Sequence, residues 1–214
     1  MKVKEFIEKN VKWIALFICL VLIIGIVVEV LDNEINKLDV SGYKFISENF
    51  ISDNLTPIVK VITQLGGEIF LILLAIILFI VIKNKKTGFM IWLNLGLSAL
   101  LNQILKHIIQ RPRPDEYRIV DANGYSFPSG HSMVSAAFYG FLIYLIYKNV
   151  KNKYLKWSLI SALGLLVILI GTSRIYLGVH YTSDVLAGFL IAISYLIVFC
   201  KKGTVLFLNW DRSF

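Results

Sequence analysis

Apolar residues in this chain come in long blocks, separated by short stretches rich in lysine, asparagine or proline. Each block is about 20 residues long, the length that an α-helix needs to cross the hydrocarbon core of a bilayer. The pattern predicts an all-α, polytopic membrane protein that forms one domain over residues 1–214, with its motifs gathered in residues 100–200. We expect six transmembrane helices, at about 13–31, 58–82, 87–109, 129–147, 157–174 and 180–200.

The segment between the first two predicted spans, residues 32–57, has a different pattern. Its apolar residues recur irregularly among acidic and other polar residues. Such a segment suits a short helix that lies in the membrane interface with its apolar side toward lipid. Pro57 stands where the next helix would begin, since proline is well tolerated in the first turn of a helix.

Composition supports a membrane location. Hydrophobic residues make up 57% of the chain and the mean hydropathy is +0.72, above the values usual for soluble domains. The net charge of +8 could indicate a nucleic-acid partner, but the lysines stand beside the apolar blocks, where cytoplasmic flanks need them. No nucleic-acid partner is therefore expected. Cys19 and Cys200 lie in apolar blocks and are interpreted as small buried hydrophobic residues.

The distribution of lysine and arginine predicts the topology. With six spans both termini lie on one side, and 14 of the 22 Lys and Arg residues fall in the terminal segments and in residues 83–86 and 148–156. The other 8 fall on the opposite side. The positive-inside rule therefore places the termini in the cytoplasm of a multi-pass cell-membrane protein.

Three polar clusters lie at the ends of predicted spans on the side away from the termini. The first runs from Lys106 to Pro114, the second from Pro128 to His131, and the third from Ser173 to Asp184. Because each cluster begins or ends an apolar block, all three can meet at one membrane surface.

The cationic residues of these clusters suit a phosphate group. Lys106, Arg113 and Arg174 come from separate elements and can spread positive charge around the oxygens of a transferring phosphoryl group. Ser129 can cap the helix that begins at Gly130, which leaves backbone amides free to bind an anion. Snorkelling explains a single such cation better, but it does not explain the whole set.

The third cluster also contains a candidate nucleophile. His180 and Asp184 are four residues apart, so they lie on one face of a helix. The carboxylate can accept the Nδ1 hydrogen and leave Nε2 with a lone pair for attack on phosphorus. His131, which opens another helix, is the candidate general acid that protonates the leaving oxygen.

The pattern K-x6-R-P, P-S-G-H and S-R-x5-H-x3-D resembles that of the type 2 phosphatidic acid phosphatase superfamily. The matching residues are Lys106, Arg113, Pro114, Pro128, Ser129, Gly130, His131, Ser173, Arg174, His180 and Asp184. With six spans in a short chain, the sequence is most similar to the bacterial members that act on phosphatidylglycerophosphate or undecaprenyl diphosphate.

The resemblance implies a lipid phosphatase that uses neither a metal nor another cofactor. It implies that His180 is the nucleophile and forms a phosphohistidine, that Asp184 is its partner, and that His131 is the acid. It further implies that the substrate phosphate is bound by Lys106, Arg113, Ser129, Gly130 and Arg174.

Two other functions are compatible with parts of the pattern. One is a phosphatase for a soluble phosphomonoester, and the other is a non-enzymatic phospholipid carrier with the same basic pocket. The His180–Asp184 spacing argues against the carrier, since binding alone needs no oriented nucleophile. The sequence leaves open whether the lipid is phosphatidylglycerophosphate, undecaprenyl diphosphate or phosphatidic acid.

Three further charged residues lie near the clusters. Arg111 and Arg118 are expected to face solvent or lipid headgroups, and the sequence leaves open whether either contacts the substrate phosphate. Glu68 follows Gly66-Gly67 near the outer end of the second span, where both a role in the site and simple exposure at a helix end are open.

Overall fold

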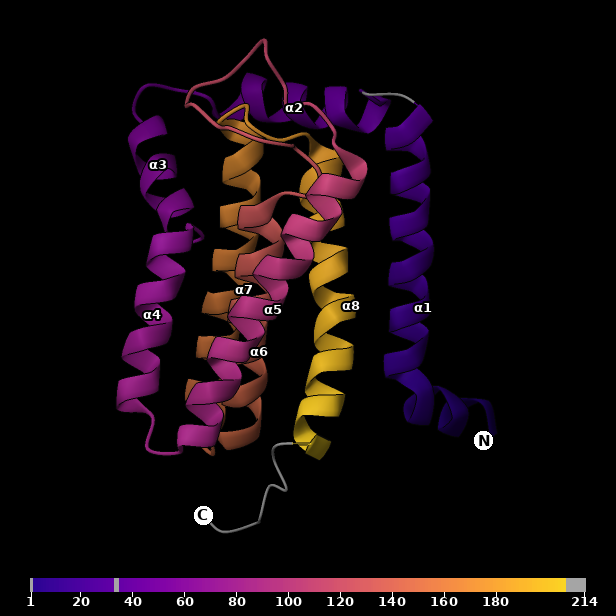
Figure 1. Ribbon diagram of the computed structural model, residues 1–214, viewed down its shortest axis with the longest axis vertical. Helices are drawn as coiled ribbons and strands as arrows, with labels where there is room; N and C mark the ends of the chain where they lie inside the picture. Colours follow the sequence, from indigo (N-terminus) through magenta and orange to yellow (C-terminus); the bar gives the residue numbers. More distant parts are fainter. Residues whose placement is uncertain (1, 33–34, 207–214) are drawn as a thin grey trace.

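The computed structural model describes residues 2–32 and 35–206, and the secondary structure in these residues is entirely helical (Figure 1). The all-α fold expected from the apolar blocks is therefore confirmed. The helices are α1 (Lys2–Asp32), α2 (Lys37–Phe50), α3 (Thr56–Gln64), α4 (Glu68–Val81), α5 (Lys85–Ile109), α6 (Gly130–Asn149), α7 (Lys153–Tyr176) and α8 (Thr182–Leu206).

Five helices in the described residues are long and apolar enough to cross a membrane: α1, α5, α6, α7 and α8. The consecutive helices α3 and α4 pass the same test together, although they are bent by 48° at a short break. Counting this pair as one span gives the six that the sequence predicts.

The second span is thus broken, where the apolar pattern predicts one continuous helix over 58–82. The break falls at Gly66 and Gly67, and a Cβ on Gly66 would lie 2.4 Å from Cγ2 of Ile170. Glycine therefore lets the break approach α7 closely. The hydroxyl of Tyr139 on α6 donates a 2.7 Å hydrogen bond to the carbonyl of Leu65, which satisfies a backbone group within the bend.

Helix α6 lies at the centre of the bundle, packed against α5, α7 and α8, while α1 packs on the outer side of α8. Its buried side chains include Phe138, Tyr139 and Phe141, which pack with Leu71 of α4 and Ile170 of α7. This core fixes the positions of α5, α6, α7 and α8 relative to one another, including the helix ends that carry the three polar clusters.

Helix α2 lies across one end of the bundle, transverse to the spans (Figure 1). Asn36 caps it, and a reciprocal capping box joins Asn36 to Asp39. Asp39 and Ile46 are buried against the bundle, whereas Leu38, Phe45 and other apolar side chains are exposed. The helix expected between the first two spans is present, and its exposed apolar residues fit an interfacial position.

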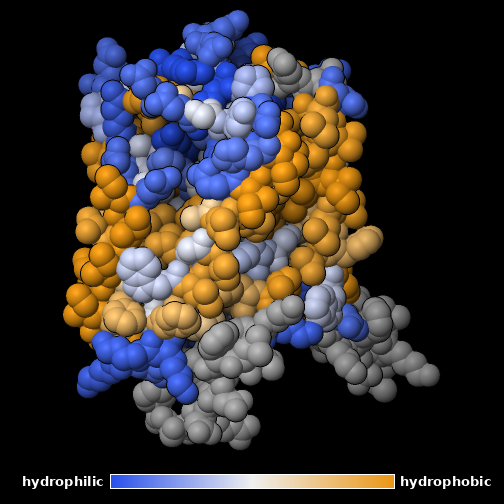
Figure 2. Space-filling model, viewed as in Figure 1, coloured by the Kyte–Doolittle hydropathy of each residue, from blue (hydrophilic) through white to orange (hydrophobic). Residues whose placement is uncertain are grey.

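The surface shows a band of hydrophobic residues around the middle of the bundle, with hydrophilic residues above and below it (Figure 2). The upper hydrophilic zone lies over α2 and the loops beside it. Helix α1 begins, and helix α8 ends, at the opposite end of the bundle from α2 (Figure 1).

Candidate active site

The three polar clusters meet at the end of the bundle that α2 covers. Lys106 lies in the last turn of α5, and Arg174 lies in the last turn of α7. Ser129 caps α6, as the sequence predicts, and accepts a hydrogen bond from the backbone N–H of Ser132. Asp184 lies in the first turn of α8. Helix ends far apart in sequence thus deliver the polar side chains to one place.

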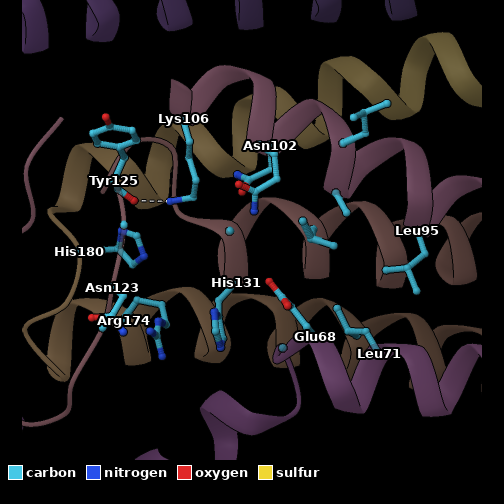
Figure 3. A pocket seen from close by; sticks show the side chains of 18 of the residues that line it. Glu68, Leu71, Leu95, Asn102, Lys106, Asn123, Tyr125, His131, Arg174 and His180 are labelled. Carbon is cyan, nitrogen blue, oxygen red and sulfur yellow. Dashed lines mark hydrogen bonds between the residues drawn. The ribbon is translucent and has the colours of Figure 1, made fainter. Parts of the chain in front are cut away.

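These residues surround a cavity of about 840 Å³ (Figure 3). Of the residues predicted from the sequence, six line it: Lys106, Arg113, Gly130, His131, Arg174 and His180. Ser129 and Asp184 are fully buried behind the wall. The structure therefore brings the eight predicted site residues together, six on the cavity surface and two behind it.

Lys106 and Arg174 supply positive charge from two different helices. The Lys106 Nζ donates to the carbonyl of Tyr125, and the Arg174 Nη1 donates to Oγ1 of Thr63 at 2.7 Å. Both side chains are buried, and the Nε of Arg174 has no hydrogen-bond partner among the described residues. A buried donor without a partner is unfavourable, so an anion in this cavity would gain a hydrogen bond there.

Arg113 is held by the loop that precedes α6. Its Nε and Nη2 donate to the carbonyls of Gly124 and Asn123 at 2.9 and 3.0 Å, and Nη1 donates to the carbonyl of Val179 at 2.9 Å. Nη1 also lies 3.0 Å from Nε2 of His180. Burial lowers the pKa of the Arg113 guanidinium, but an arginine stays charged at neutral pH.

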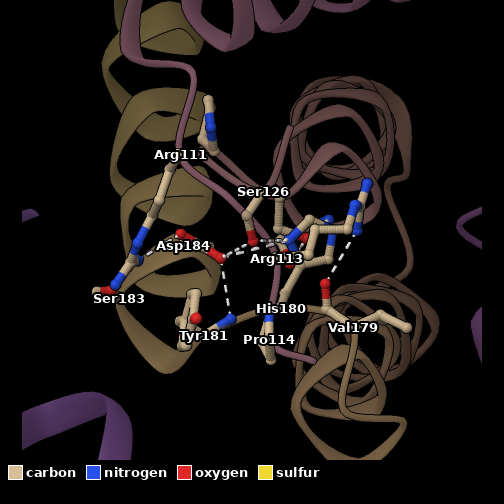
Figure 4. A network of polar contacts seen from close by, with 12 residues as sticks. Arg111, Arg113, Pro114, Ser126, Val179, His180, Tyr181, Ser183 and Asp184 are labelled. Atoms are coloured by element: carbon tan, nitrogen blue, oxygen red, sulfur yellow. Dashed lines mark hydrogen bonds and ion pairs between the residues drawn. The ribbon is translucent and has the colours of Figure 1, made fainter. Parts of the chain in front are cut away.

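His180 is buried and is oriented from its Nδ1 side (Figure 4). Nδ1 lies 3.4 Å from Oδ2 of Asp184 and 3.3 Å from Oγ of Ser126. Because a guanidinium can only donate, the Arg113 contact requires a lone pair on Nε2 and therefore places the hydrogen on Nδ1. Burial lowers the pKa of His180 to about 3, against the opposing effect of Asp184, so the ring is neutral near pH 7.

Asp184 receives hydrogen bonds on both carboxylate oxygens. Ser126 Oγ and the Tyr181 backbone N–H donate to Oδ2 at 2.5 and 2.9 Å, and Arg111 donates to Oδ1 at 2.7 Å. The carboxylate is fully buried and its position is fixed by these donors. It can therefore hold the imidazole of His180 in one tautomer and one orientation.

His131 comes from the first turn of α6 and lines the cavity, where it lies between Arg174 and Glu68 in the view of Figure 3. Gly130 precedes it, and a Cβ at that position would lie 3.1 Å from Oδ1 of Asn102. The two histidines thus face the cationic cavity from two different elements.

The expectation that Arg111 faces solvent or headgroups is wrong. Arg111 is 3% exposed, and its guanidinium pairs with Asp39 and Asp184, both at 2.7 Å. The Pro112–Pro114 segment turns the chain so that Arg113 enters the cavity while Arg111 points behind it. Arg118 does lie at the surface, where it pairs with Asp115 at 2.5 Å.

Sequence reasoning missed Ser126 and Asp39. Ser126 lies three residues before Ser129 and looks like an ordinary loop serine. Asp39 lies outside the motif-bearing part of the chain, and its one sequence signal is the Asn36-x-x-Asp39 capping pattern, which predicts a helix start but no partner. In the described residues, no three His, Cys, Asp or Glu side chains gather where they could hold a metal ion.

The far end of the cavity is apolar and lies deeper in the bundle, between α4 and α5 (Figure 3). Its lining there comprises Leu71, Ile72, Trp92, Leu95, Gly96, Ala99, Leu100 and Val134. Glu68, the first residue of α4, lies at the transition from polar to apolar lining, with its carboxylate toward His131 (Figure 3). One cavity thus joins a basic end to an apolar end.

Known proteins are similar to this chain in sequence. Residues 69–204 match the PAP2 superfamily. The phosphatidylglycerophosphatase B of Bacillus subtilis is 38% identical over 154 residues, which cover 70% of this chain and 74% of that protein. The undecaprenyl-diphosphatase of Sulfolobus acidocaldarius is 28% identical over 203 residues, covering 89% and 91% of the two chains.

A solved structure shows the same fold. It is the crystal structure of a transmembrane PAP2-type phosphatidylglycerolphosphate phosphatase from Bacillus subtilis, with a TM-score of 0.79 and 27% identity. The similarity covers 92% of this chain and 98% of that one. The chain belongs to the PAP2 superfamily, as a membrane phosphatase that hydrolyses phosphoric esters.

Proposed function

We propose that this protein removes the terminal phosphate of a lipid phosphate or diphosphate at the outer membrane face, through a phosphohistidine on His180. The observation that carries the proposal is the environment of His180. Asp184 holds its Nδ1 side, its Nε2 lone pair faces the cavity, and the cations Lys106, Arg113 and Arg174 line that cavity.

In the first step, the phosphate occupies the basic end of the cavity and Arg113 transfers its hydrogen bond from Nε2 of His180 to a phosphate oxygen. Nε2 then forms a bond to phosphorus while the bond between phosphorus and the leaving oxygen breaks. The leaving oxygen keeps the electron pair and takes a proton from His131. The three cations stabilise the charge on the equatorial oxygens.

In the second step, water attacks the phosphohistidine and gives its proton to His131. The phosphorus–nitrogen bond breaks, its electron pair returns to Nε2, and inorganic phosphate leaves. The net reaction is the ester plus water giving an alcohol plus phosphate. While His180 carries the phosphoryl group its imidazole is positively charged. Asp184 stabilises this charge without accepting the Nδ1 proton.

The shape of the cavity supports a lipid substrate. A soluble phosphate ester would fill the basic end only, whereas a lipid could also place its chain against Leu71, Leu95 and Leu100. Each buried methylene contributes about 0.8 kcal/mol, so chain burial adds affinity that a small headgroup lacks. The relatives named above act on phosphatidylglycerophosphate and undecaprenyl diphosphate, and either lipid class fits a cavity with these two ends.

The proposed sidedness rests on the charge pattern. The cavity lies at the α2 end, opposite the end where α1 begins and α8 ends, and the lysine-rich segments flank that opposite end.

In intact cells, a variant with Cys19 and Cys200 replaced by alanine and a new cysteine at Asn123 should react with an impermeant thiol reagent. The matched control has its cysteine at Lys151, an exposed residue in the α6–α7 loop, and should not react. Labelling at 151 but not at 123 would place the site on the cytoplasmic face.

The mechanism is tested by trapping the intermediate. The purified full chain would be mixed with a lipid phosphate labelled in its terminal phosphate and quenched in alkali, where a phosphorus–nitrogen bond survives. Label should attach to the wild-type chain and not to His180→Ala. Turnover by His180→Ala would refute the mechanism. Equal catalytic efficiency of the wild type on the lipid phosphate and on glycerol phosphate would favour a soluble substrate. Binding of the lipid phosphate by the wild type without turnover would favour a carrier.

A further inference from the structure

A buried network of ion pairs links the interfacial helix α2 to Asp184, the partner of the proposed nucleophile His180. Arg111 Nη2 donates to Oδ2 of Asp39, and Arg111 Nη1 donates to Oδ1 of Asp184, both at 2.7 Å. Nη1 also donates to Oγ of Ser183 at 2.7 Å (Figure 4). One planar guanidinium thus bridges two carboxylates from segments that are 145 positions apart in the sequence.

Asp39 is the residue of this charge network that lies on α2, and several groups hold its carboxylate in place. Its Oδ1 accepts the backbone N–H of Ser183 at 2.8 Å, at the start of α8, where a negative charge is favourable. Its Oδ2 also lies 3.4 Å from the backbone nitrogen of Asn36 in the capping box. Asp39 is 2% exposed, so water cannot replace these partners.

The position of Asp184 depends on Arg111. Arg111 donates to its Oδ1 and is itself held by Ser183, while Oδ2 faces Ser126, Tyr181 and His180. A carboxylate with a fixed Oδ1 cannot rotate, so Oδ2 stays directed at Nδ1 of His180. Burial alone would lower the pKa of Arg111, but the two carboxylates raise it above the ordinary value. The bridging cation is therefore permanent.

We propose that Asp39 and Arg111 are positioning residues for phosphoryl transfer, which act on His180 through Asp184 and make helix α2 part of the catalytic apparatus. Asp39 fixes the plane of the Arg111 guanidinium, Arg111 fixes the Asp184 carboxylate, and Asp184 fixes the imidazole. This inference rests on the proposed histidine mechanism. It concerns the chemical step only, because neither residue lines the cavity and phosphate binding depends on Lys106, Arg113 and Arg174.

The test uses Asp39→Asn, which keeps the shape of the side chain and removes its charge. Loss of an outer hydrogen-bond partner of a metal-binding residue lowers activity by about 10–100-fold, and by analogy we expect a loss of kcat in this range. The vanadate inhibition constant and KM should stay within about twofold, since the phosphate-binding cations are unchanged. Glu48→Gln is the matched control, because it makes the same chemical change on the exposed side of α2, where Glu48 pairs loosely with Lys44 at 3.8 Å.

A second measurement separates positioning from a merely structural role. Introduced into Asp184→Asn, where the residue through which Asp39 acts is already altered, Asp39→Asn should lower kcat by no more than about twofold. A structural defect would instead lower kcat by the same factor in both backgrounds, and that result would overturn the inference. Thermal unfolding in detergent, followed for every variant, identifies any loss that comes from unfolding.

Arg111→Lys carries the same test if Asp39→Asn does not fold, because lysine keeps the charge but cannot bridge both carboxylates. We expect the same selective loss of kcat. His180→Ala is assayed in parallel: activity in that variant would refute the histidine mechanism itself. The positioning inference alone would be overturned if His180→Ala is inactive while Asp39→Asn and Arg111→Lys both fold and keep the wild-type kcat.

Discussion

Arg113 Nη1 lies 3.0 Å from Nε2 of His180, so a phosphate-binding cation donates a hydrogen bond to the nitrogen that is proposed to attack phosphorus. This contact engages the Nε2 lone pair and fixes the tautomer that the proposed reaction needs. On the proposed mechanism, an arriving phosphate would compete for the same guanidinium and so release Nε2 of His180. One side chain would then couple substrate binding to activation of His180.

Replacing Arg113 with lysine tests this coupling. Lysine keeps a positive charge but cannot reach the carbonyls of Gly124, Asn123 and Val179 together, so the charge would lose its fixed position. We expect kcat/KM to fall by about 10²–10³-fold, the usual effect of removing one preorganised donor to a transition-state oxygen. Arg118→Lys, a change of the same kind in a surface ion pair, should leave kcat/KM unchanged. Steady-state kinetics on one lipid phosphate measures both variants.

The low pKa of His180 predicts how stability depends on pH. The folded protein holds this ring neutral down to a pKa of about 3, whereas an unfolded chain protonates histidine near pH 6.5. Between these values the unfolded state binds more protons, so the folded state loses stability as pH falls from 6.5 toward 3. At pH 4.5 the difference of about two pH units corresponds to roughly 3 kcal/mol.

His180→Gln removes this titration and provides the comparison. Thermal unfolding in detergent at pH 7 and at pH 4.5 should show a larger fall in Tm for the wild type than for His180→Gln. Other titrating groups are common to both proteins and cancel in the comparison. Equal falls in Tm would mean that His180 is not held neutral by burial.

Local sequence patterns predicted the parts of the site that lie at helix ends. The pairing of His180 with Asp184, the Ser129 cap and the prolines after Arg111 and Arg113 each act over a few residues, so the sequence alone identifies them. The prediction that the pair lies on one helix face is wrong, because α8 begins at Thr182 and His180 lies in the turn before it. The helix between the first two spans was likewise predicted from its irregular apolar pattern.

Tertiary contacts explain what sequence reasoning missed. Arg111 points away from the cavity because it pairs with Asp39. Asp39 comes close to Arg111 only because α2 packs against the start of α8. The bend between α3 and α4 depends on the packing of Gly66 against Ile170, which no pattern in the second span reveals. Long-range ion pairs and close backbone packing are set by the assembled bundle, not by the periodicity of one segment.

Filling the apolar end of the cavity should select against long lipids. Gly96 on α5 lines this end, and a Cβ there would meet no atom within 4 Å. Gly96→Leu should lower kcat/KM for a long-chain lipid phosphate roughly tenfold, the effect of displacing about two buried methylenes. Catalytic efficiency on a water-soluble phosphate ester should stay within about twofold, because the basic end is unchanged.

Gly164→Leu on α7 is the matched control for this prediction. A Cβ at Gly164 also meets nothing within 4 Å, but Gly164 does not line the cavity. Both substitutions should raise helix stability slightly, since glycine is unfavourable in a helix interior. An equal loss of kcat/KM on long and short substrates in Gly96→Leu would show that the lipid chain lies elsewhere.

The two histidines should respond differently to the leaving group. His131→Ala removes the proposed acid, so the loss should be largest for an alkyl ester, at about 10²–10⁴-fold, and smallest for an aryl phosphate that departs without a proton. A diphosphate should fall between them, because phosphate leaves more easily than an alcohol. His180→Ala removes the nucleophile, so no leaving group should restore turnover. Kinetics of both variants on the three substrates checks the assignment, and aryl rescue of His180→Ala but not of His131→Ala would mean that the two roles are reversed.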